Sequence, residues 1–351
     1  MINDRKTLII LSPGFPANEE DSACLPAQQS FVRSLNKNFP DLKIIILAFE
    51  YPFVRSAYLW HNNSVISFAG KNRRKIFRLI MWRKIWQELK KINKQENIIG
   101  LLSFWCTETA LVGKLFAKKF KLKHFCWVLG QDARKGNKMI RFIKPKSEEL
   151  IAMSDSLATE FFLNYKIHPK YIIPNGINPE LFSENNSEKD IEISAAGSLI
   201  PLKRYDIFID IINEINKTIP SAKEILCGKG EEEKKIKLLI EKFNLQNNIT
   251  LTGEISHAEV LKIMQRSKIF LHTSSYEGFS GACLEALYSG AHVISFCQPM
   301  KQEIGHWHIV KTKEEMFHKT LELLSDPSTD FSPVLPFTMD NAAREMMRLF
   351  V

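Results

Sequence analysis

The chain has 351 residues, 45% hydrophobic and 25% charged, which is the balance of a globular protein long enough for two hydrophobic cores. It has no run of 18 apolar residues, so we expect no membrane-spanning helix. The first apolar run breaks at Pro13-Gly14, which argues against a signal peptide and predicts a cytoplasmic protein. The net charge of +9 is unevenly divided. Residues 1–150 carry 27 Lys and Arg against 12 Asp and Glu, and the remainder carries 21 against 27. The first half is therefore expected to meet an anionic partner or to be heavily solvated.

The cysteines are scattered and lack the close pairs of a zinc or redox motif, so they are expected to be buried, reduced thiols. They are Cys24, Cys106, Cys126, Cys227, Cys283 and Cys297. We expect no bound metal, no organic cofactor and no nucleic-acid partner.

Short apolar runs alternate with helix-length amphipathic stretches along the whole chain. Five such runs, starting at Thr7, Lys43, Ile98, His124 and Leu150, are predicted to be buried strands. The pattern stops over 172–190, which is rich in Pro, Gly and Asn, and then restarts with five further runs. We predict two doubly wound α/β domains of Rossmann type, residues 1–173 and 191–337, joined by a linker over 174–190. Residues 338–351 are predicted to contain a helix that packs back across both domains.

The densest positive charge lies in residues 71–95, where basic residues such as Arg73, Arg74, Lys84 and Lys91 alternate with Ile, Leu and Trp. A basic amphipathic helix with tryptophans is typical of a segment that lies on an anionic membrane surface. An ordinary sheet-covering helix with a solvated basic face would have the same composition. The sequence leaves both interpretations open.

The most specific pattern is SSYEGFSGACLEALYSGAHVISF, residues 274–296. A strand should end near Thr273 and a helix should begin near Gly281. The helix start would leave backbone N–H groups free to bind an anion. Glu277 and Glu285 flank that point, and each carboxylate can accept hydrogen bonds from paired sugar hydroxyls. The pattern therefore predicts a nucleotide-sugar site.

This segment resembles the retaining glycosyltransferases of family 4, whose GT-B fold has two Rossmann-like domains facing across a cleft. Their motif is close to EGFGxxxxE, and this chain has EGFSGACLE. The resemblance implies that Glu277 contacts the donor sugar and Glu285 the nucleotide ribose. It also implies that the backbone of Gly278, Phe279, Ser280 and Gly281 faces the sugar and diphosphate. The first domain would then bind the acceptor and the second the donor.

Three further stretches match the family in the expected order: PNGINPELF, AAGSLIPLKRYDIFIDII and LCGKGEEEKKIKLLI. By this resemblance Lys203 holds the diphosphate, Gly228 lies at the donor, Gly253 flanks the base and Gly14 lies near the phosphates across the cleft. The match covers most of residues 150–300, whereas the first half of the chain agrees only in general layout.

The chain also departs from the family pattern. Ser198 stands where an Arg that binds the diphosphate is often found, and Arg204 replaces the Gly after Lys203, where it could restore the lost charge. Many members have a His near the reacting centre, and here Gln131 and Asp132 come closest to that place. We therefore assign catalytic roles to Glu277, Lys203 and Asp132.

The predicted activity is transfer of a hexose, with retention, from a UDP- or GDP-sugar to a glycan or lipid-linked acceptor in surface polysaccharide synthesis. No Asp-x-Asp triplet occurs, so we expect no metal requirement. A dinucleotide oxidoreductase is disfavoured because neither domain opens with G-x-G-x-x-G. A GT-B sugar-nucleotide epimerase and an inactive homologue with a purely binding role stay open as alternatives.

Overall fold

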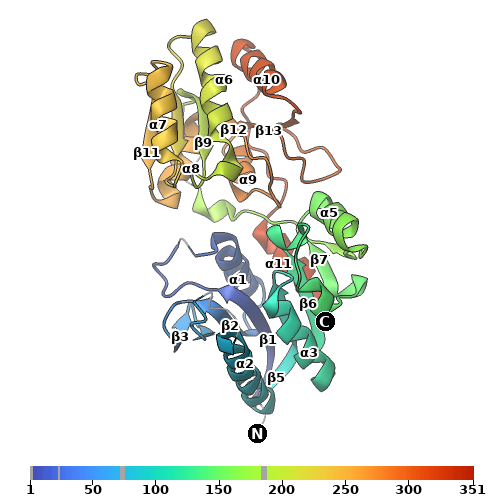
Figure 1. Ribbon diagram of the computed structural model, residues 1–351. Coiled ribbons are helices and arrows are strands. Elements are labelled where there is room, and N and C mark those ends of the chain that lie inside the picture. Colours follow the sequence, from blue (N-terminus) through green and yellow to red (C-terminus); the bar gives the residue numbers. More distant parts are fainter. Residues whose placement is uncertain (1–2, 23, 72–75, 183–187) are drawn as a thin grey trace. The chain divides into compact units, whose positions relative to one another are not determined.

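The computed structural model describes residues 3–22, 24–71, 76–182 and 188–351 (Figure 1). The chain divides into two compact units. Unit 1 comprises Met1–Gly176 with Met339–Val351, and unit 2 comprises Ile177–Thr338. Each unit contains one mainly parallel sheet with helices on its faces, so the predicted α/β class is confirmed. The boundary falls inside the predicted linker 174–190, of which residues 183–187 lie outside the described part.

The sheet of unit 1 has the strand order β3-β4-β2-β1-β5-β6-β7-β8. Its strands are β1 (Asn3–Gly14), β2 (Lys43–Tyr51), β3 (Ser56–Trp60), β4 (Asn63–Ser67), β5 (Glu96–Phe104), β6 (Lys123–Val128), β7 (Leu150–Ala152) and β8 (Tyr171–Ile172). The central strands are near-continuous apolar runs because helices cover both faces of the sheet, and Leu8 to Leu11 are fully buried. The five strands predicted in this half are all present.

One hairpin in unit 1 does not follow from the apolar runs. β4 pairs with β2 in parallel, and β3 then pairs with β4 in the antiparallel direction at the sheet edge. His61 and Asn62, with φ of 42° and 65°, form the tight turn between them. Neither strand has a long apolar run, and the turn contains no glycine.

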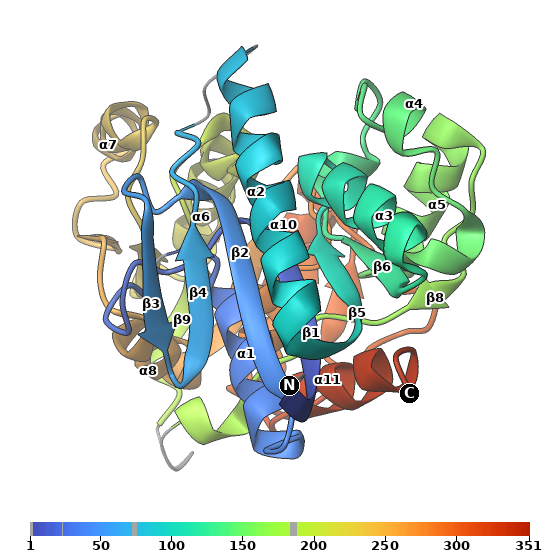
Figure 2. The same cartoon turned by 90° about the horizontal axis from the view of Figure 1, so that it is seen from below.

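Helices cover both faces of this sheet (Figure 2). α2 (Ile76–Gln95) and α3 (Glu108–Phe120) cover one face, and α1 (Pro26–Asn38) and α11 (Met339–Arg348) pack together on the other. Two shorter helices, α4 (Ile140–Ile143) and α5 (Asp155–Tyr165), follow near the β7 edge. The C-terminal segment is part of unit 1, since a Cβ on Gly100 of β5 would lie 2.5 Å from the ring of Phe350.

The sheet of unit 2 has the order β11-β10-β9-β12-β13-β14. Its strands are β9 (Ile191–Ala196), β10 (Glu224–Cys227), β11 (Ile249–Gly253), β12 (Ser267–His272), β13 (His292–Ser295) and β14 (Trp307–Ile309). Its helices are α6 (Tyr205–Thr218), α7 (Glu233–Lys242), α8 (His257–Arg266), α9 (Gly281–Tyr288) and α10 (Lys313–Ser325). The chain runs outward from β9 to β11 and then returns to the other side of β9 as β12. The carboxyl ends of β9 and β12 therefore form a topological switch point, where open α/β sheets bind their ligands.

The basic helix predicted over 71–95 is described from Ile76 as α2, whereas Arg73 and Arg74 lie outside the described residues. Its buried side chains are Met81, Ile85, Leu89 and Ile92. The first turns instead expose four large apolar side chains, Ile76 (64%), Phe77 (54%), Leu79 (61%) and Ile80 (46%). The later turns of this helix therefore cover the sheet, while its first five residues leave these apolar side chains exposed.

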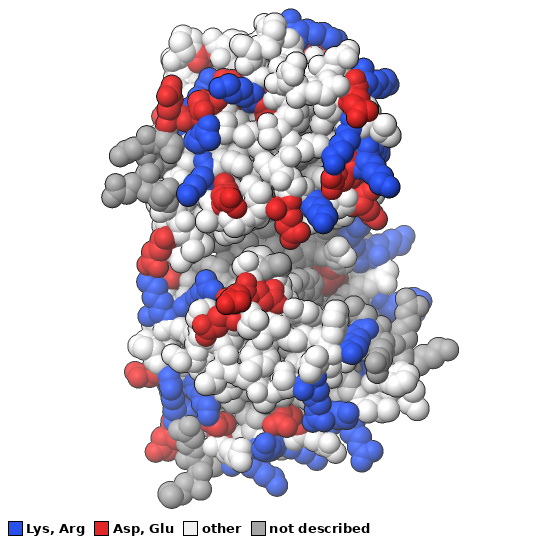
Figure 3. Space-filling view, turned by 90° about the vertical axis from the view of Figure 1, so that its left-hand side faces the viewer, with Lys and Arg blue, Asp and Glu red and all other residues white. Residues whose placement is uncertain are grey.

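The surface shown in Figure 3 intersperses Lys and Arg with Asp and Glu over both units. Among the described residues, no helix is both long and apolar enough to cross a bilayer. Within the same residues, no group of three or more His, Cys, Asp or Glu side chains is placed to hold a metal ion. All six cysteines are free, four of them buried, while Cys24 and Cys297 are partly exposed.

Candidate donor site in unit 2

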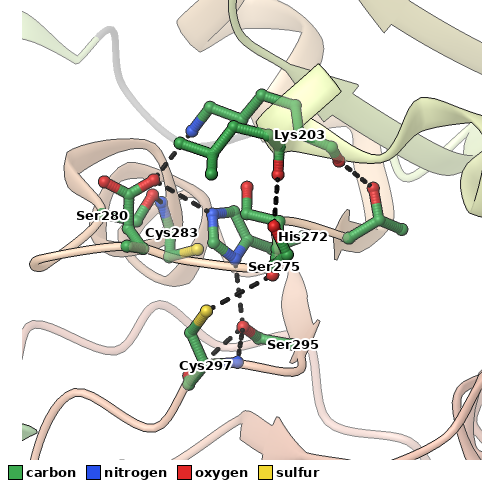
Figure 4. A network of polar contacts seen from close by, with 11 residues as sticks. Lys203, His272, Ser275, Ser280, Cys283, Ser295 and Cys297 are labelled. Carbon is green, nitrogen blue, oxygen red and sulfur yellow. Dashed lines mark hydrogen bonds and ion pairs between the residues drawn. The ribbon is translucent and has the colours of Figure 1, made fainter. Parts of the chain in front are cut away.

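Two loops of unit 2 meet at the switch point, one after β9 and one after β12 (Figure 4). Thr273 Oγ1 donates to the carbonyl oxygen of Lys203 at 2.7 Å, and the backbone N–H of Ser275 donates to the carbonyl oxygen of Leu202 at 3.0 Å. These bonds join segments about 70 residues apart in the chain. The two loops are thus held together before any ligand arrives.

Lys203 and Glu277, both predicted to be catalytic, form an ion pair in which Lys203 Nζ lies 2.7 Å from Glu277 Oε2. Their side chains are only 21% and 27% exposed. Burial alone would raise the pKa of Glu277, but the neighbouring His272 and Lys203 outweigh it and lower the pKa to about 2. Glu277 is therefore a carboxylate at neutral pH, able to accept hydrogen bonds from hydroxyl groups.

His272, which ends β12, was missed by the sequence analysis. Its side chain is 5% exposed, and its Nε2 atom lies 3.6 Å from Glu277 Oε2. Its Nδ1 atom lies 3.0 Å from Ser295 Oγ on β13 (Figure 4). The only sequence signal was its position, five residues before Glu277 at the end of a buried strand. A histidine there is ordinarily part of the core.

The N-terminus of α9 follows directly and begins at Gly281, as predicted. Ser280 is its N-cap, with Oγ accepting from the backbone N–H of Cys283 at 3.3 Å. The first-turn N–H groups of such a helix have no intrahelical acceptors and favour an anion. Phe279 is buried, stacked on Trp307 with 6.0 Å between ring centroids, so its backbone alone is available to a ligand.

Glu285 lies one turn into α9 and is held by a residue that the motif does not contain. His257 Nε2, at the start of α8, lies 2.8 Å from Glu285 Oε1. The hydrogen bond to Glu285 raises the pKa of His257 against the opposing effect of burial. The predicted ribose-binding carboxylate is thus fixed in orientation.

Ser198 and Gly228 line one cavity of about 260 Å³ at the carboxyl ends of β9 and β10. Gly228 has φ of 140°, and a Cβ there would lie 2.0 Å from the carbonyl oxygen of Gly197. Its N–H donates to the carbonyl oxygen of Gly253 at 2.9 Å. Only glycine at position 228 allows the loop after β10 to approach Gly197, in the loop after β9, so closely.

Arg204 does not point its charge at Ser198 in this structure. Its guanidinium pairs with Asp206, with Nε 3.1 Å from Oδ1, on the exposed first turn of α6. Its φ of 51° lies in the left-handed region, which glycine adopts without strain. The left-handed φ therefore explains why a glycine suits position 204. Among the described residues, no hydrogen bond or ion pair links Arg204 to the Lys203–Glu277 pair.

Gly14 and Asp132 belong to unit 1, where Gly14 ends β1 and Asp132 lies in a short 3-10 helix, Gln131–Ala133, that follows β6. Asp132 is 4% exposed, and its carboxylate accepts backbone N–H groups from Cys106 (2.7 Å), Gly130 (2.9 Å) and Leu129 (3.2 Å). Burial raises the pKa of Asp132 to about 6 despite these bonds. The carboxylate ties the turns after β5 and β6 together, and its assignment as a catalytic residue stays a prediction.

Comparison with known proteins finds a family resemblance over the residues that contain this candidate site. The family model described as glycosyl transferases group 1 matches residues 177–331. Those residues are therefore similar to the group 1 glycosyl transferases. They comprise nearly all of unit 2, including Lys203, Glu277 and Glu285.

Two curated relatives match parts of this chain at 26% and 31% identity. The phosphatidylinositol N-acetylglucosaminyltransferase gpi3 subunit of Schizosaccharomyces pombe is 26% identical over 239 residues, 66% of this chain and 52% of the relative. The 2-deoxystreptamine N-acetyl-D-glucosaminyltransferase of Niallia circulans is 31% identical over 99 residues, 28% of this chain and 25% of its own length. The chain thus spans about half or less of the curated relatives that it matches.

Solved structures of glycosyltransferases share the fold across both units. A glycosyltransferase from Rickettsia africae has a TM-score of 0.73 at 15% identity and covers 99% of this chain and 98% of its own. Anabaena HepE in complex with UDP and glucose has a TM-score of 0.65 at 16% identity, covering 97% and 94%. The predicted GT-B fold is confirmed.

Proposed function

We propose that this protein is a retaining group 1 glycosyltransferase that moves a sugar from a nucleotide-sugar donor, bound by unit 2, to a hydroxyl of a glycan or lipid-linked acceptor. The observation that carries the proposal is the half-buried Lys203–Glu277 ion pair beside the N-terminus of α9. It sets a cation, a carboxylate and a helix N-terminus at the carboxyl edge of one sheet. A nucleotide sugar needs the first and third for its diphosphate and the second for its hydroxyls.

These groups would contact different parts of the donor. Glu277 accepts hydrogen bonds from sugar hydroxyls, and Glu285, steadied by His257, accepts them from the ribose. Lys203 and the α9 N-terminus neutralise the charge that develops on the leaving diphosphate. Once donor binding has brought Lys203 to the diphosphate, both groups are in place before the chemical step, so they stabilise the transition state without further reorganisation. Binding energy from the nucleotide positions the sugar for attack on the face that the diphosphate leaves.

The donor is best sought among UDP-sugars with an N-acetylated hexose. The names of the Schizosaccharomyces pombe and Niallia circulans relatives specify N-acetylglucosaminyl transfer, and HepE was solved with UDP and glucose. UDP-N-acetylglucosamine is therefore our first candidate, followed by UDP-glucose and other UDP- and GDP-hexoses. The identity of the acceptor would decide whether the protein acts in surface polysaccharide synthesis.

The test is incubation of the full chain with a panel of UDP- and GDP-sugars, followed by NMR. Slow release of a free sugar that initially keeps the donor's anomeric configuration, with the nucleoside diphosphate, supports a retaining transferase. Formation of an epimeric nucleotide sugar would identify an epimerase instead. If a donor binds by calorimetry and is not turned over with any of a set of acceptors, the chain is a binding subunit.

We also propose that unit 1 contacts an anionic membrane surface through α2. Of the large apolar side chains exposed on the described helices, Ile76, Phe77, Leu79 and Ile80 are the one group of four within five residues. Arg83, Lys84, Lys90 and Lys91 are exposed on the same helix. Apolar side chains beside basic ones suit the boundary between lipid headgroups and acyl chains. A lipid-linked acceptor would be reached from that boundary.

A further inference from the structure

A buried imidazole touches the candidate site without belonging to the motif that identifies it. His272 Nε2 faces Glu277 Oε2 at 3.6 Å, which is longer than a hydrogen bond, and Nε2 has no hydrogen-bond partner among the described residues. Burying a polar nitrogen without a partner is costly. Nε2 therefore has a hydrogen-bonding capacity that the contacts of the described residues leave unused.

The environment of the ring decides which nitrogen carries the proton. Ser295 Oγ lies 3.0 Å from His272 Nδ1 and 3.2 Å from the carbonyl oxygen of Cys297. If Ser295 donates to Nδ1, the ring proton is on Nε2 and faces the Glu277 carboxylate. If Ser295 donates to Cys297, the proton is on Nδ1 and the Nε2 lone pair faces the same negative charge. The first arrangement is favoured, because the second places the Nε2 lone pair against the Glu277 carboxylate, and the two repel each other in a buried site.

Lys203 and Glu277 are the charged pair at this site, because the neighbouring cysteine, tyrosine and histidine side chains are neutral. Burial raises the pKa of Cys297 to about 11 and raises the pKa values of Cys283 and Tyr205 further. These groups are therefore uncharged at neutral pH. Burial, with the charge of Lys203, lowers the pKa of His272, so the ring is neutral there too.

We propose that His272 is a positioning residue for Glu277, holding its carboxylate by an Nε2–H hydrogen bond when Lys203 turns to the donor diphosphate. The inference rests on the proposed function, in which one ammonium group serves both the carboxylate and the diphosphate. In the structure Lys203 is bound to Glu277. Once it engages a diphosphate, the half-buried carboxylate loses its main counter-charge. A shortening of about 0.6 Å would bring Nε2 to normal hydrogen-bond distance and replace that partner.

The first experiment needs neither donor nor turnover. Lys203→Met removes the ammonium group and keeps the stem, and carbon-13 NMR then follows the titration of the Glu277 carboxyl group, assigned with Glu277→Gln. We compare Lys203→Met with Lys203→Met/His272→Phe, in which the second change keeps a ring and removes the N–H donor. We expect the Glu277 pKa to lie about one unit or more higher in the double variant. Equal values in the two variants would overturn the proposal.

The second experiment measures turnover in the full chain with intact Lys203. We expect His272→Phe to lower kcat on the order of 10-fold or more, to leave KM for the donor nearly unchanged, and to move the acidic limb of the kcat profile to higher pH. His272→Gln, whose amide can donate from a similar position, should recover part of kcat. Ser295→Ala removes the hydroxyl partner of His272 Nδ1. It should shift the kcat profile in the same direction as His272→Phe, but by a smaller amount.

A buried histidine that does not touch Glu277 supplies the control. His292 on β13 is 5% exposed and bonds to His308 and the carbonyl oxygen of Asp330. If His292→Phe and His272→Phe lower kcat equally with the same pH profile, His272 is a packing residue and the proposal fails. If the wild type turns over no donor, the proposed function fails, and the NMR comparison still decides the role of His272.

Discussion

Lys203 and Glu277, 74 residues apart in sequence, lie 2.7 Å apart at the end of the unit 2 sheet. The family resemblance assigns them to different parts of the donor, the lysine to the diphosphate and the glutamate to the sugar. In the structure they neutralise each other. A donor must therefore exchange this internal pair for two contacts of its own, so its binding is coupled to the charge state of both residues.

The two glutamates should respond differently to loss of charge. Glu277→Gln should lower kcat on the order of 10²-fold or more, because its contact must strengthen in the transition state. Glu285→Gln should mainly raise KM for the donor, because a ribose contact is the same in the ground and transition states. Steady-state kinetics with one donor measures both variants. Near-native kinetics for the pair would remove the basis of the assignment.

Activity should not require a divalent metal. Lys203 and the N-terminus of α9 can neutralise the leaving diphosphate, so turnover should persist in excess EDTA. Lys203→Ala should then lower kcat on the order of 10²-fold. The matched control is Lys217→Ala, which removes an exposed lysine paired with Glu214 in the last turn of α6 and should leave kcat unchanged. Loss of activity in EDTA with recovery on Mg²⁺ or Mn²⁺ would contradict the prediction and indicate a carboxylate site for the metal.

Arg204 tests whether a neighbouring cation compensates for Ser198. The structure pairs Arg204 with Asp206 and gives it a left-handed φ of 51°, so we expect Arg204→Gly to relieve strain and to keep or raise the melting temperature. We also expect kcat to change little, because the guanidinium is already engaged outside the pair. A large loss of kcat, rescued by adding Ser198→Arg, would show instead that Arg204 moves to the diphosphate when donor binds.

The sequence predicted the strands whose apolar runs are continuous and missed the β3–β4 hairpin. Buried parallel strands must be apolar on both faces, so runs such as that from Lys43 are recognisable. An edge hairpin needs apolar residues on one face only, and its turn at His61 and Asn62 reaches positive φ without the usual glycine. The packing of Phe350 on Gly100 was equally hidden, since it joins residues from opposite ends of the chain.

For the site, the motif predicts which residues bind the donor, but it does not predict which side chains those residues contact. The Glu277–Glu285 spacing and the Gly281 helix start are local, and both are present. The partners His272 and His257 come from other elements, and their positions follow from sheet order and helix packing. Phe279 shows the same limit, because its place in the motif does not reveal that its ring is buried on Trp307.

Asp132 should give a pH dependence of stability with a definite sign. Its pKa is about 6 in the fold and near 4 in an unfolded chain, so the native state binds the extra proton. Its contribution is fully present below about pH 4 and is lost as pH rises through about 6. Asp132→Asn cannot lose a proton and places an amide N–H₂ beside backbone donors, so it should melt below wild type at about pH 4.5. The gap should narrow by about pH 7. A gap that widens with pH would mean that the three N–H bonds keep the carboxylate ionised.

Membrane binding through α2 should depend on both its apolar and its basic side chains. The full chain should co-sediment with vesicles containing anionic phospholipid at low salt and should dissociate as salt rises, because screening weakens the attraction of basic residues to the surface. Changing Phe77, Leu79 and Ile80 together to Ser removes exposed apolar surface and should reduce binding at all salt concentrations.

Reversing charge at Arg73, Arg74, Lys84 and Lys91 should instead reduce the binding that low salt supports, since these residues supply the electrostatic part. Leu238 on α7 of unit 2 is 64% exposed and provides a control, because Leu238→Ser removes an exposed apolar side chain that does not belong to α2. The Phe77, Leu79 and Ile80 side chains are exposed, so their loss should leave the melting temperature nearly unchanged. Absence of wild-type binding at low salt would show that α2 only covers the sheet, and equal release by the Leu238 control would show adsorption without a defined surface.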